Sequence, residues 1–330
     1  MIPESLPLVY FGKLPARGDF VRARAHISET NAIDEWVSQA LAISEKIFSG
    51  NPIDRANGND SSNEITCLNF SHVDTKSNEI ITGVLIPSHD SSHRNYPLIG
   101  FGVLHSDKPK NWMNYLPVKS SALWHDTYEI LSMAKSKTDS ADLMDYLNHS
   151  QLTVDNSAST YYYDFINTTT LHDIALLMNI DKPQLVQQII ATGLLFLPTF
   201  TKGFHGLNKV ICWSLTSDQD SSIYMATFWH DLINSFYQPH QLYLNTYIYR
   251  VANGYRLLLS FSKPDGRILE QISENASQYP EGWVVIADSD WTQGYIDEDI
   301  GLTRFNKVLL QDNLYLYDTR QLFKKVFLAQ

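Results

Sequence analysis

Cysteine is scarce in this chain of 330 residues, which contains only Cys67 and Cys212. The two are far apart, and each lies in an apolar, strand-like stretch, so no disulfide framework is indicated and we expect buried free thiols. Residues 1–5 have neither a basic region nor a continuous apolar stretch, so no signal peptide is predicted. The longest apolar run, near 189–200, is too short to span a bilayer. These absences predict a cytoplasmic protein without membrane insertion.

Basic residues are also fewer than acidic residues in this chain. The 25 Lys and Arg residues against 36 Asp and Glu give a formal net charge of −11. The longest run of basic residues is the pair Lys324-Lys325. Because an acidic surface repels the phosphate backbone and anionic lipids, the composition argues against nucleic acids and acidic membranes as partners.

The order of apolar patterns predicts a mixed α/β fold, with a central β-sheet flanked by helices. The 44% hydrophobic and 18% charged content is typical of a globular protein with a substantial core. Strands are predicted at 8–11, 65–70, 80–86, 98–104, 210–215, 223–227, 242–250, 255–262, 283–287 and 314–317. Helices are predicted at 31–48, 120–134, 182–195, 228–237 and 319–328.

Turn signals divide this pattern. Asn253-Gly254 favours a tight hairpin between two of the strands, and the polar stretch 51–63 indicates a mobile loop. Gln238-Pro239-His240 is the best candidate for a boundary. We therefore expect one domain over 1–238 and a C-terminal α/β extension of unknown role over 239–330.

The first of two informative motifs follows the strand predicted at 8–11. Gly12 and Gly18 are expected to adopt backbone angles closed to other residues, and Pro15 to stiffen the loop between them. Arg17 and Asp19 are then displayed at a fixed place, either for recognition or paired internally. The spacing lacks the Gly-Lys-Ser/Thr ending of a phosphate-binding loop. The motif reads FGKLPARGDFV over residues 11–21.

The second motif lies about seventy residues further on, between Pro87, which ends one strand, and Pro97, which begins the next. An arginine can hold a carboxylate by two parallel hydrogen bonds, and loops at strand ends of one sheet are often neighbours. We therefore expect the two loops to meet. The predicted ion pair joins Arg94 or Arg17 to Asp19 or Asp90.

Two chemical alternatives arise in the second motif. Ser88, Asp90 and His93 are the residue types of a hydrolytic triad, but no Gly-x-Ser-x-Gly elbow surrounds the serine, so a hydrolase is the weaker alternative. His89 and His93 could ligate a metal, but such a pair gives two ligands and needs a helix to align them. Pro87 and the neighbouring serines indicate a loop. We predict no metal and no cofactor.

Together the two motifs resemble the signatures of the TagF family of type VI secretion accessory proteins. The family's first loop reads Gly-Lys-Leu-Pro-x-Arg-Gly-Asp-Phe, and its second signature is similar to Pro-Ser-x-Asp-x-x-Gly-Arg-x-(aromatic)-Pro-Leu. Trp36, which we expect in the core, corresponds to the tryptophan of a family helix. The matching residues of this chain are Gly12, Lys13, Pro15, Arg17, Gly18, Asp19, Phe20, Pro87, Ser88, Asp90, Arg94, Tyr96, Pro97 and Leu98.

One residue departs from the family pattern. His93 stands where the family usually has glycine. If that position needs a positive φ, a non-glycine residue costs on the order of 1 kcal/mol. The resemblance is clear over roughly residues 7–130 and faint beyond them.

The resemblance implies a cytoplasmic, non-enzymatic protein that represses type VI secretion after translation. It implies binding to components of the secretion apparatus, with the forkhead-associated scaffold protein Fha as a candidate. The expected contact loops are 13–20 and 88–96. The first alternative is an assembly adaptor of the same apparatus, and the second is the hydrolase built on Ser88, Asp90 and His93.

Overall fold

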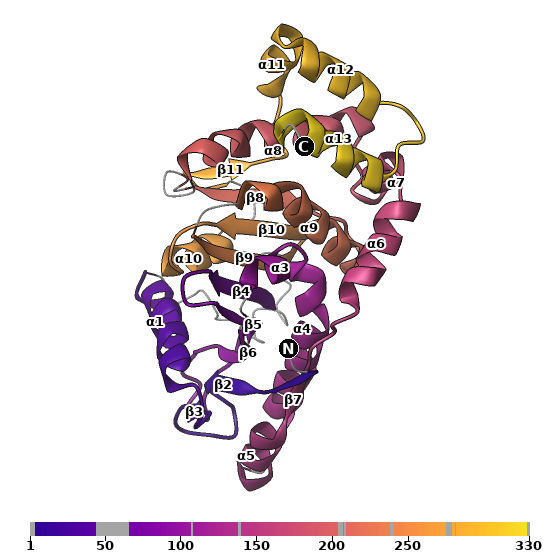
Figure 1. Cartoon of the computed structure of the whole chain (residues 1–330). Helices are drawn as coiled ribbons and strands as arrows, with labels where there is room; N and C mark the ends of the chain where they lie inside the picture. Colours follow the sequence, from indigo (N-terminus) through magenta and orange to yellow (C-terminus); the bar gives the residue numbers. More distant parts are fainter. Residues whose placement is uncertain are drawn as a thin grey trace.

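The computed structural model in Figure 1 confirms the mixed α/β class, with helices packed against a central sheet. None of the described helices is long and apolar enough to cross a membrane. The structure describes residues 4–43, 66–106, 108–137, 140–203, 207, 209–237, 241–274, 279–280 and 282–328.

The strands are β1 (Ser5–Pro7), β2 (Val9–Gly12), β3 (Val21–Arg22), β4 (Leu68–Asp74), β5 (Glu79–Ile86), β6 (Leu98–His105), β7 (Gln151–Thr153), β8 (Val210–Ser214), β9 (Tyr243–Val251), β10 (Gly254–Ser260) and β11 (Trp283–Val285). Within the described residues, nine of them form one sheet in the order β11-β8-β10-β9-β4-β5-β6-β2-β3, and β1 pairs with β7 separately.

The helices are α1 (Ile27–Ile43), α3 (Pro109–Met113), α4 (Leu116–Ser136), α5 (Ser140–His149), α6 (Ala158–Thr168), α7 (Leu171–Leu177), α8 (Lys182–Lys202), α9 (Gln219–Ile233), α10 (Gly266–Glu274), α11 (Thr292–Glu298), α12 (Ile300–Leu309) and α13 (Leu316–Leu328), with a short 3₁₀ turn, η2 (Asn234–Tyr237).

The central strands are covered on both faces, because nearly every residue of β5 and β6 is buried. This explains why their sequences are continuous apolar runs instead of alternating patterns. On one face, Trp36 of α1 packs against Phe70 of β4 and Tyr247 of β9. On the other face α4 lies so close that a Cβ on Gly100 would meet Thr127 at 2.8 Å. Trp36 is thus a core residue, as expected.

The hairpin predicted at Asn253-Gly254 is confirmed, because β9 pairs with β10 across a tight turn. Gly254, the first residue of β10, has a φ of +141°. β4 likewise pairs with β5. The strands at 8–11, 98–104, 210–215 and 283–287 are also present, within a few residues of their expected ends. The sequence patterns do not predict the β1–β7 pair or the helices α10 to α12.

The strand predicted at 223–227 is wrong, because these residues belong to α9. Their β-branched Ile223 and Thr227 favour a strand, but the Asp218 side chain accepts a hydrogen bond from the Ser221 amide and caps a helix instead. The strand predicted at 314–317 is wrong too. Only Tyr315 is extended, in an isolated bridge to Thr170, and α13 starts at the next residue.

Helix ends also differ from the predictions. The helix expected at 31–48 begins at Ile27, and its last five positions, together with the 51–63 loop, lie outside the described residues. The helix expected at 182–195 continues to Lys202, through Pro198. Both cysteines are free thiols, as expected, although Cys67 is half-buried. Burial raises the pKa of each thiol to about 12.

The boundary proposed at 238–240 also lies outside the described residues, and the division of the chain there stays a proposal. Strands on its two sides belong to the same sheet, because β9 pairs with β4 in antiparallel register over the full length of β4, from Leu68 to Asp74. β4 precedes the boundary in the chain, and β9 follows it.

A buried ion pair ties α6, α9 and α13 together. The carboxylate of Asp231 on α9 is fully buried, and Arg320 Nε of α13 lies 2.5 Å from its Oδ2. The hydroxyl of Tyr162 on α6 donates to the same oxygen at 3.0 Å, and the Lys324 ammonium lies 3.8 Å from Oδ1. Three helices therefore depend on one carboxylate.

We predict that Asp231→Ala lowers the free energy of unfolding by about 3–5 kcal/mol, because it leaves the Arg320 guanidinium without its buried counter-ion. Urea denaturation of the purified protein measures this loss. Asp290→Ala, at an exposed position, is the matched control and should change the free energy of unfolding by less than about 0.5 kcal/mol. A small loss for Asp231→Ala would contradict a central role for this ion pair.

Candidate functional site

The two motif loops lie side by side because β2 and β6 are neighbours. Gly12, the last residue of β2, pairs with Leu98, the first residue of β6. The loop that leaves β2 and the loop that enters β6 therefore start from the same end of adjacent strands. Gly12 has a φ of +137°, and a Cβ there would lie 2.1 Å from the Pro97 carbonyl oxygen. Only glycine fits this junction, which confirms the prediction for Gly12.

Asp90 lies at the centre of the joined loops, and its carboxylate is fully buried. The Lys13 ammonium lies 3.1 Å from Oδ2, and Arg94 Nε donates to the same oxygen at 2.7 Å. The backbone amides of Ser92 and Arg94 donate to Oδ1 at 2.9 and 3.0 Å. Both oxygens are thus fully engaged, and the second loop is wound around one carboxylate.

Burial by itself would raise the pKa of Asp90. The hydrogen bonds from the Arg94 amide, the Lys13 ammonium, the Ser92 amide and the Arg94 side chain outweigh burial and hold that pKa well below its usual range. Asp90 is therefore a carboxylate held in its charged form. It is not a proton donor near neutral pH.

Contacts between the loops fasten the first motif to the second. Arg94 Nη2 donates to the Gly18 carbonyl at 2.8 Å, and the Ser91 amide donates to the Arg17 carbonyl at 2.8 Å. The expectation that the loops meet is confirmed, and the predicted ion pair is Arg94 with Asp90. The ion pair between the loops is formed by Lys13, whose role as a counter-ion the sequence did not reveal.

An aromatic cluster supports the same junction. Phe20 stacks on Phe11 at a centroid distance of 5.2 Å and meets the edge of Tyr96 at 4.8 Å. The Lys13 ammonium lies 5.2 Å from the Phe20 ring, within the range of a cation–π contact. The Tyr96 hydroxyl donates to Asp34 Oδ1 of α1 at 2.7 Å. Burial and this carboxylate raise the pKa of Tyr96.

The motif residues separate into buried and exposed groups. Lys13, Ser88, Asp90 and Tyr96 are buried, and Pro15 and Arg17 are half-buried. Phe20 is 48% exposed although it stacks on Phe11, and the Arg94 side chain is 63% exposed. Gly18 and Asp19 are exposed, and no described residue forms a hydrogen bond or ion pair with the Asp19 side chain. The alternative in which Asp19 forms the internal pair is therefore wrong.

The backbone φ angles of Gly18 and His93 can be compared with the sequence predictions for these two positions. Gly18 does not have a positive φ, and a Cβ there would make ordinary contact with Ser91 Oγ at 3.5 Å, so its conformation does not require glycine. His93 does have a positive φ, +61°. The turn therefore has the left-handed conformation that glycine favours, with a histidine in it.

The residues of the hydrolase alternative do not assemble into a triad. The Ser88 hydroxyl is buried and forms no hydrogen bond with any described residue. The Asp90 carboxylate is bound to Lys13 and Arg94, and the His93 side chain is exposed. The His89 and His93 rings lie 5.2 Å apart on a loop, as the sequence suggests.

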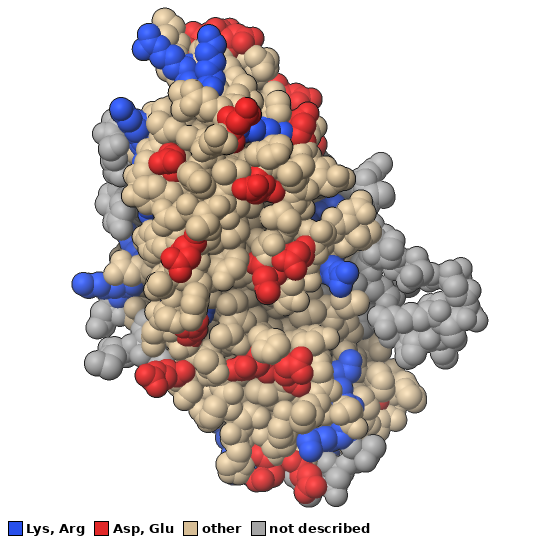
Figure 2. Space-filling model, turned by 90° about the vertical axis from the view of Figure 1, so that its right-hand side faces the viewer, with Lys and Arg blue, Asp and Glu red and all other residues tan. Residues whose placement is uncertain are grey.

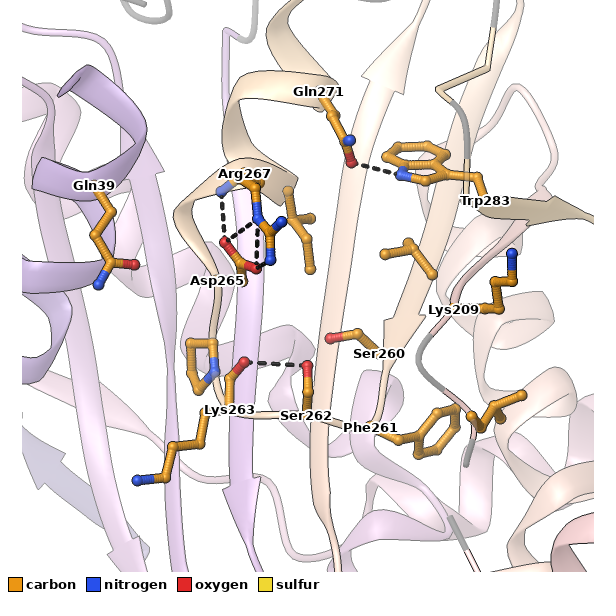
Figure 3. Close-up of a pocket in the computed structure, with 15 residues that line it drawn as sticks. Gln39, Lys209, Ser260, Phe261, Ser262, Lys263, Asp265, Arg267, Gln271 and Trp283 are labelled. Atoms are coloured by element: carbon orange, nitrogen blue, oxygen red, sulfur yellow. Dashed lines mark hydrogen bonds and ion pairs between the residues drawn. The ribbon is translucent and has the colours of Figure 1, made fainter. Parts of the chain in front are cut away.

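A second concavity lies away from the motifs, between α10 and the strands β8, β10 and β11 (Figure 3). Its volume is about 660 Å³. Arg267 and Asp265 pair with each other across 2.6 Å, and Gln271 accepts a hydrogen bond from the Trp283 indole. Lys209 and Lys263 supply further charge. No sequence motif lies at this cavity, so the joined loops remain the candidate site.

The low pKa of Asp90 gives a pH prediction for Asp90→Asn. The carboxylate stabilises the fold fully above about pH 5, and this stabilisation is lost as pH falls through the pKa of the folded state. We expect the variant to melt several degrees below wild type at pH 7, with a gap that narrows in acid. Thermal unfolding between pH 3 and pH 8 measures the gap. Asp19→Asn should melt like wild type throughout, and a gap independent of pH would contradict the assignment.

The positive φ of His93 predicts that His93→Gly stabilises the protein by about 0.5–1 kcal/mol, because relief of backbone strain exceeds the entropy cost of glycine. Urea denaturation measures the change. Ser92→Gly is the matched control in the same turn, since Ser92 lacks a positive φ and its replacement should destabilise. Equal effects of the two substitutions would show that the turn is not strained.

A protein-family model agrees with the motifs. Residues 9–149 match the family model of the TagF N-terminal domain, type VI secretion system-associated. No curated protein matches the chain. Among solved structures, the chain is similar to the crystal structure of PA0076 from Pseudomonas aeruginosa PAO1, with 17% sequence identity and a TM-score of 0.34. That alignment covers 43% of this chain and 61% of PA0076.

The matched segment runs from β2 to α5 and includes both motif loops, with the junction at Gly12 and the buried Asp90. Residues 9–149 thus match the N-terminal domain of TagF, a type VI secretion system-associated protein, and this match supports the assignment to the TagF family that the two motifs suggest.

Proposed function

We propose that this chain is a non-enzymatic, cytoplasmic regulator that represses type VI secretion after translation by binding a component of the apparatus. The observation that carries the proposal is that some motif residues are buried and others are exposed. The buried charged groups of Lys13 and Asp90 pair with each other inside the protein. What remains exposed is suited to contact with another macromolecule.

The proposed contact surface consists of Asp19, Phe20 and the outer part of Arg94. Aromatic residues and arginine are enriched at protein–protein interfaces, and Phe20 and Arg94 are both exposed. Phe20 is held by Phe11 and Tyr96, and Arg94 by Asp90 and the Gly18 carbonyl. A surface whose side chains are already fixed loses little conformational freedom on binding.

The partner that we propose is a scaffold or another component of the secretion apparatus, with the forkhead-associated scaffold protein Fha as the first candidate. Nucleic acid is a poor alternative, because the chain is acidic and Lys and Arg lie mainly toward the edges of the face shown in Figure 2. We propose that residues 239–330 act as an extension whose role is distinct from these loops.

Asp19→Lys is the sharpest probe of the contact surface, because Asp19 is exposed and has no described partner whose loss would disturb the fold. We expect the variant to melt at the wild-type temperature and to bind the apparatus component at least about tenfold more weakly, since a like-charge or unpaired contact costs over 1 kcal/mol. Co-purification from cells that make the apparatus identifies the partner. Titration of that partner with purified protein then measures affinity.

Asp290→Lys carries the same charge change on the C-terminal part and should bind like wild type. Equal binding by wild type and Asp19→Lys would exclude these loops as the contact surface.

Deletion of the gene separates the regulatory alternatives: increased secretion supports a repressor, and decreased secretion supports an assembly adaptor. Ser88→Ala tests the hydrolase, which requires that this substitution abolish the cellular effect.

A further inference from the structure

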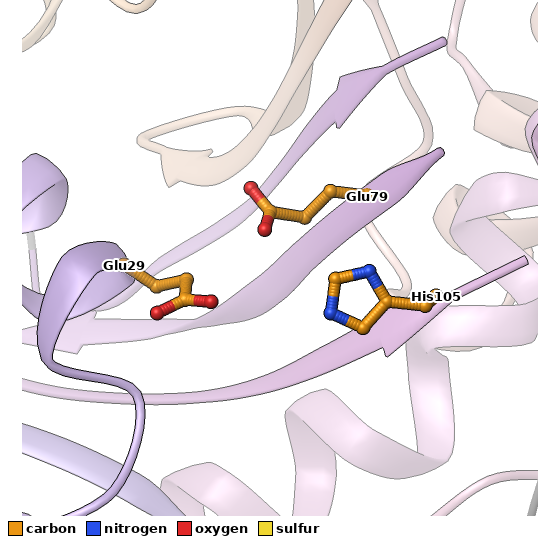
Figure 4. A group of neighbouring side chains, drawn as sticks. All are labelled: Glu29, Glu79 and His105. Carbon is orange, nitrogen blue, oxygen red and sulfur yellow. The ribbon is translucent and has the colours of Figure 1, made fainter. Parts of the chain in front are cut away.

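Three side chains of the types that can ligate a metal lie together outside the motif loops, where α1 begins and where β5 and β6 meet. Glu79 is the first residue of β5 and His105 the last of β6, and the two are direct cross-strand partners. Glu29, in the first turn of α1, reaches toward them (Figure 4). One ligand atom from each of the three lies within 4.8 Å of the others. The chain thus brings together two carboxylates and an imidazole from three separate elements.

Glu29 is already oriented by its neighbours. The Ser28 hydroxyl donates to Oε2 at 2.6 Å, and His26 Nδ1 lies 3.5 Å from Oε1. Carboxylates that bind metals are commonly held in this way by a second layer of hydrogen bonds, which fixes the direction of their free lone pairs. His26 and Ser28 would therefore act as positioning residues, and Glu29 as a ligand.

The cluster also has unbalanced charge. Within the described part of the chain, no Lys or Arg pairs with Glu29 or Glu79, although both glutamates are half-buried. Burial raises the pKa of Glu79, and the nearby Glu29 and Asp74 carboxylates raise it further, while His105 and His26 oppose this. Two carboxylates crowded together without a strong counter-charge are stabilised when a divalent cation binds between them.

We propose that Glu29, Glu79 and His105 bind a divalent first-row transition-metal ion, for which Zn²⁺ is the appropriate probe. One imidazole and two carboxylates form a mixed nitrogen and oxygen set of the kind these ions take, with the remaining positions open to water. At metal–ligand distances of about 2.0–2.2 Å, the donor atoms must move to within about 3.5 Å of one another. His105 is exposed, so its side chain can rotate to close the site.

Calorimetric titration of the EDTA-treated full chain with Zn²⁺ tests the proposal. We expect wild type to bind one ion, and Glu79→Gln and His105→Ala each to weaken binding at least about tenfold. The matched control is the double variant His89→Ala, His93→Ala, which removes the two neighbouring histidines of the second motif loop and should bind like wild type. Melting temperatures measured in EDTA check that each variant folds.

The melting temperature gives a second test that does not depend on calorimetric heats of binding. Zn²⁺ should raise the melting temperature of wild type and of the double-histidine control, but not that of Glu79→Gln or His105→Ala, because an ion that binds only the folded state stabilises it. The proposal is overturned if wild type shows no saturable binding, if the two site variants bind like wild type, or if binding is lost in the His89 and His93 control.

Discussion

The buried carboxylate of Asp90 is the interaction on which the rest of the motif region depends. A charge removed from water is tolerated only when its lone pairs are filled, and here an ammonium, a guanidinium and two backbone amides fill them. Lys13 comes from one loop and Arg94 from the other. One charge therefore fixes the shape of the second loop and its attachment to the first.

This constraint changes how the motif is understood. A pattern rich in Lys, Arg and Asp suggests a charged recognition surface, but Lys13, Asp90 and Arg94 are engaged in ion pairs with one another. Lys13 is buried, and Arg94 is bound at both its Nε and its Nη2. In the function that we propose, recognition depends on the exposed groups that remain, Asp19 and Phe20 above all. Substitutions at Asp90 and Asp19 should therefore have different consequences, although both residues belong to the motifs.

The sequence predicted the elements of this region, the meeting of the two loops and the pair of Arg94 with Asp90, but it did not reveal the pair of Lys13 with Asp90. Apolar runs and the prolines at 87 and 97 marked the ends of β5 and β6, because proline cannot continue a central strand. The pairing of Lys13 with Asp90 joins residues far apart in the chain, and no local pattern carries it. The errors at 223–227 and 314–317 have a common cause: β-branched and aromatic residues favour strands, whereas the Asp218 cap and the packing of α13 imposed helices. The cluster of Glu29, Glu79 and His105 is likewise assembled only by the fold.

The sheet also limits how far the N-terminal domain can be considered by itself. The family match ends at 149, yet the outer edge of its β4 is covered by β9, which lies beyond the matched segment in the chain. Phe70 of β4 and Tyr247 of β9 both pack under Trp36 of α1. Without β9, an apolar strand edge and one side of this core would be exposed, a condition that favours aggregation. The loops at one end of the sheet and the C-terminal strands are therefore parts of one folded structure, and what binds one part can influence the stability of the other.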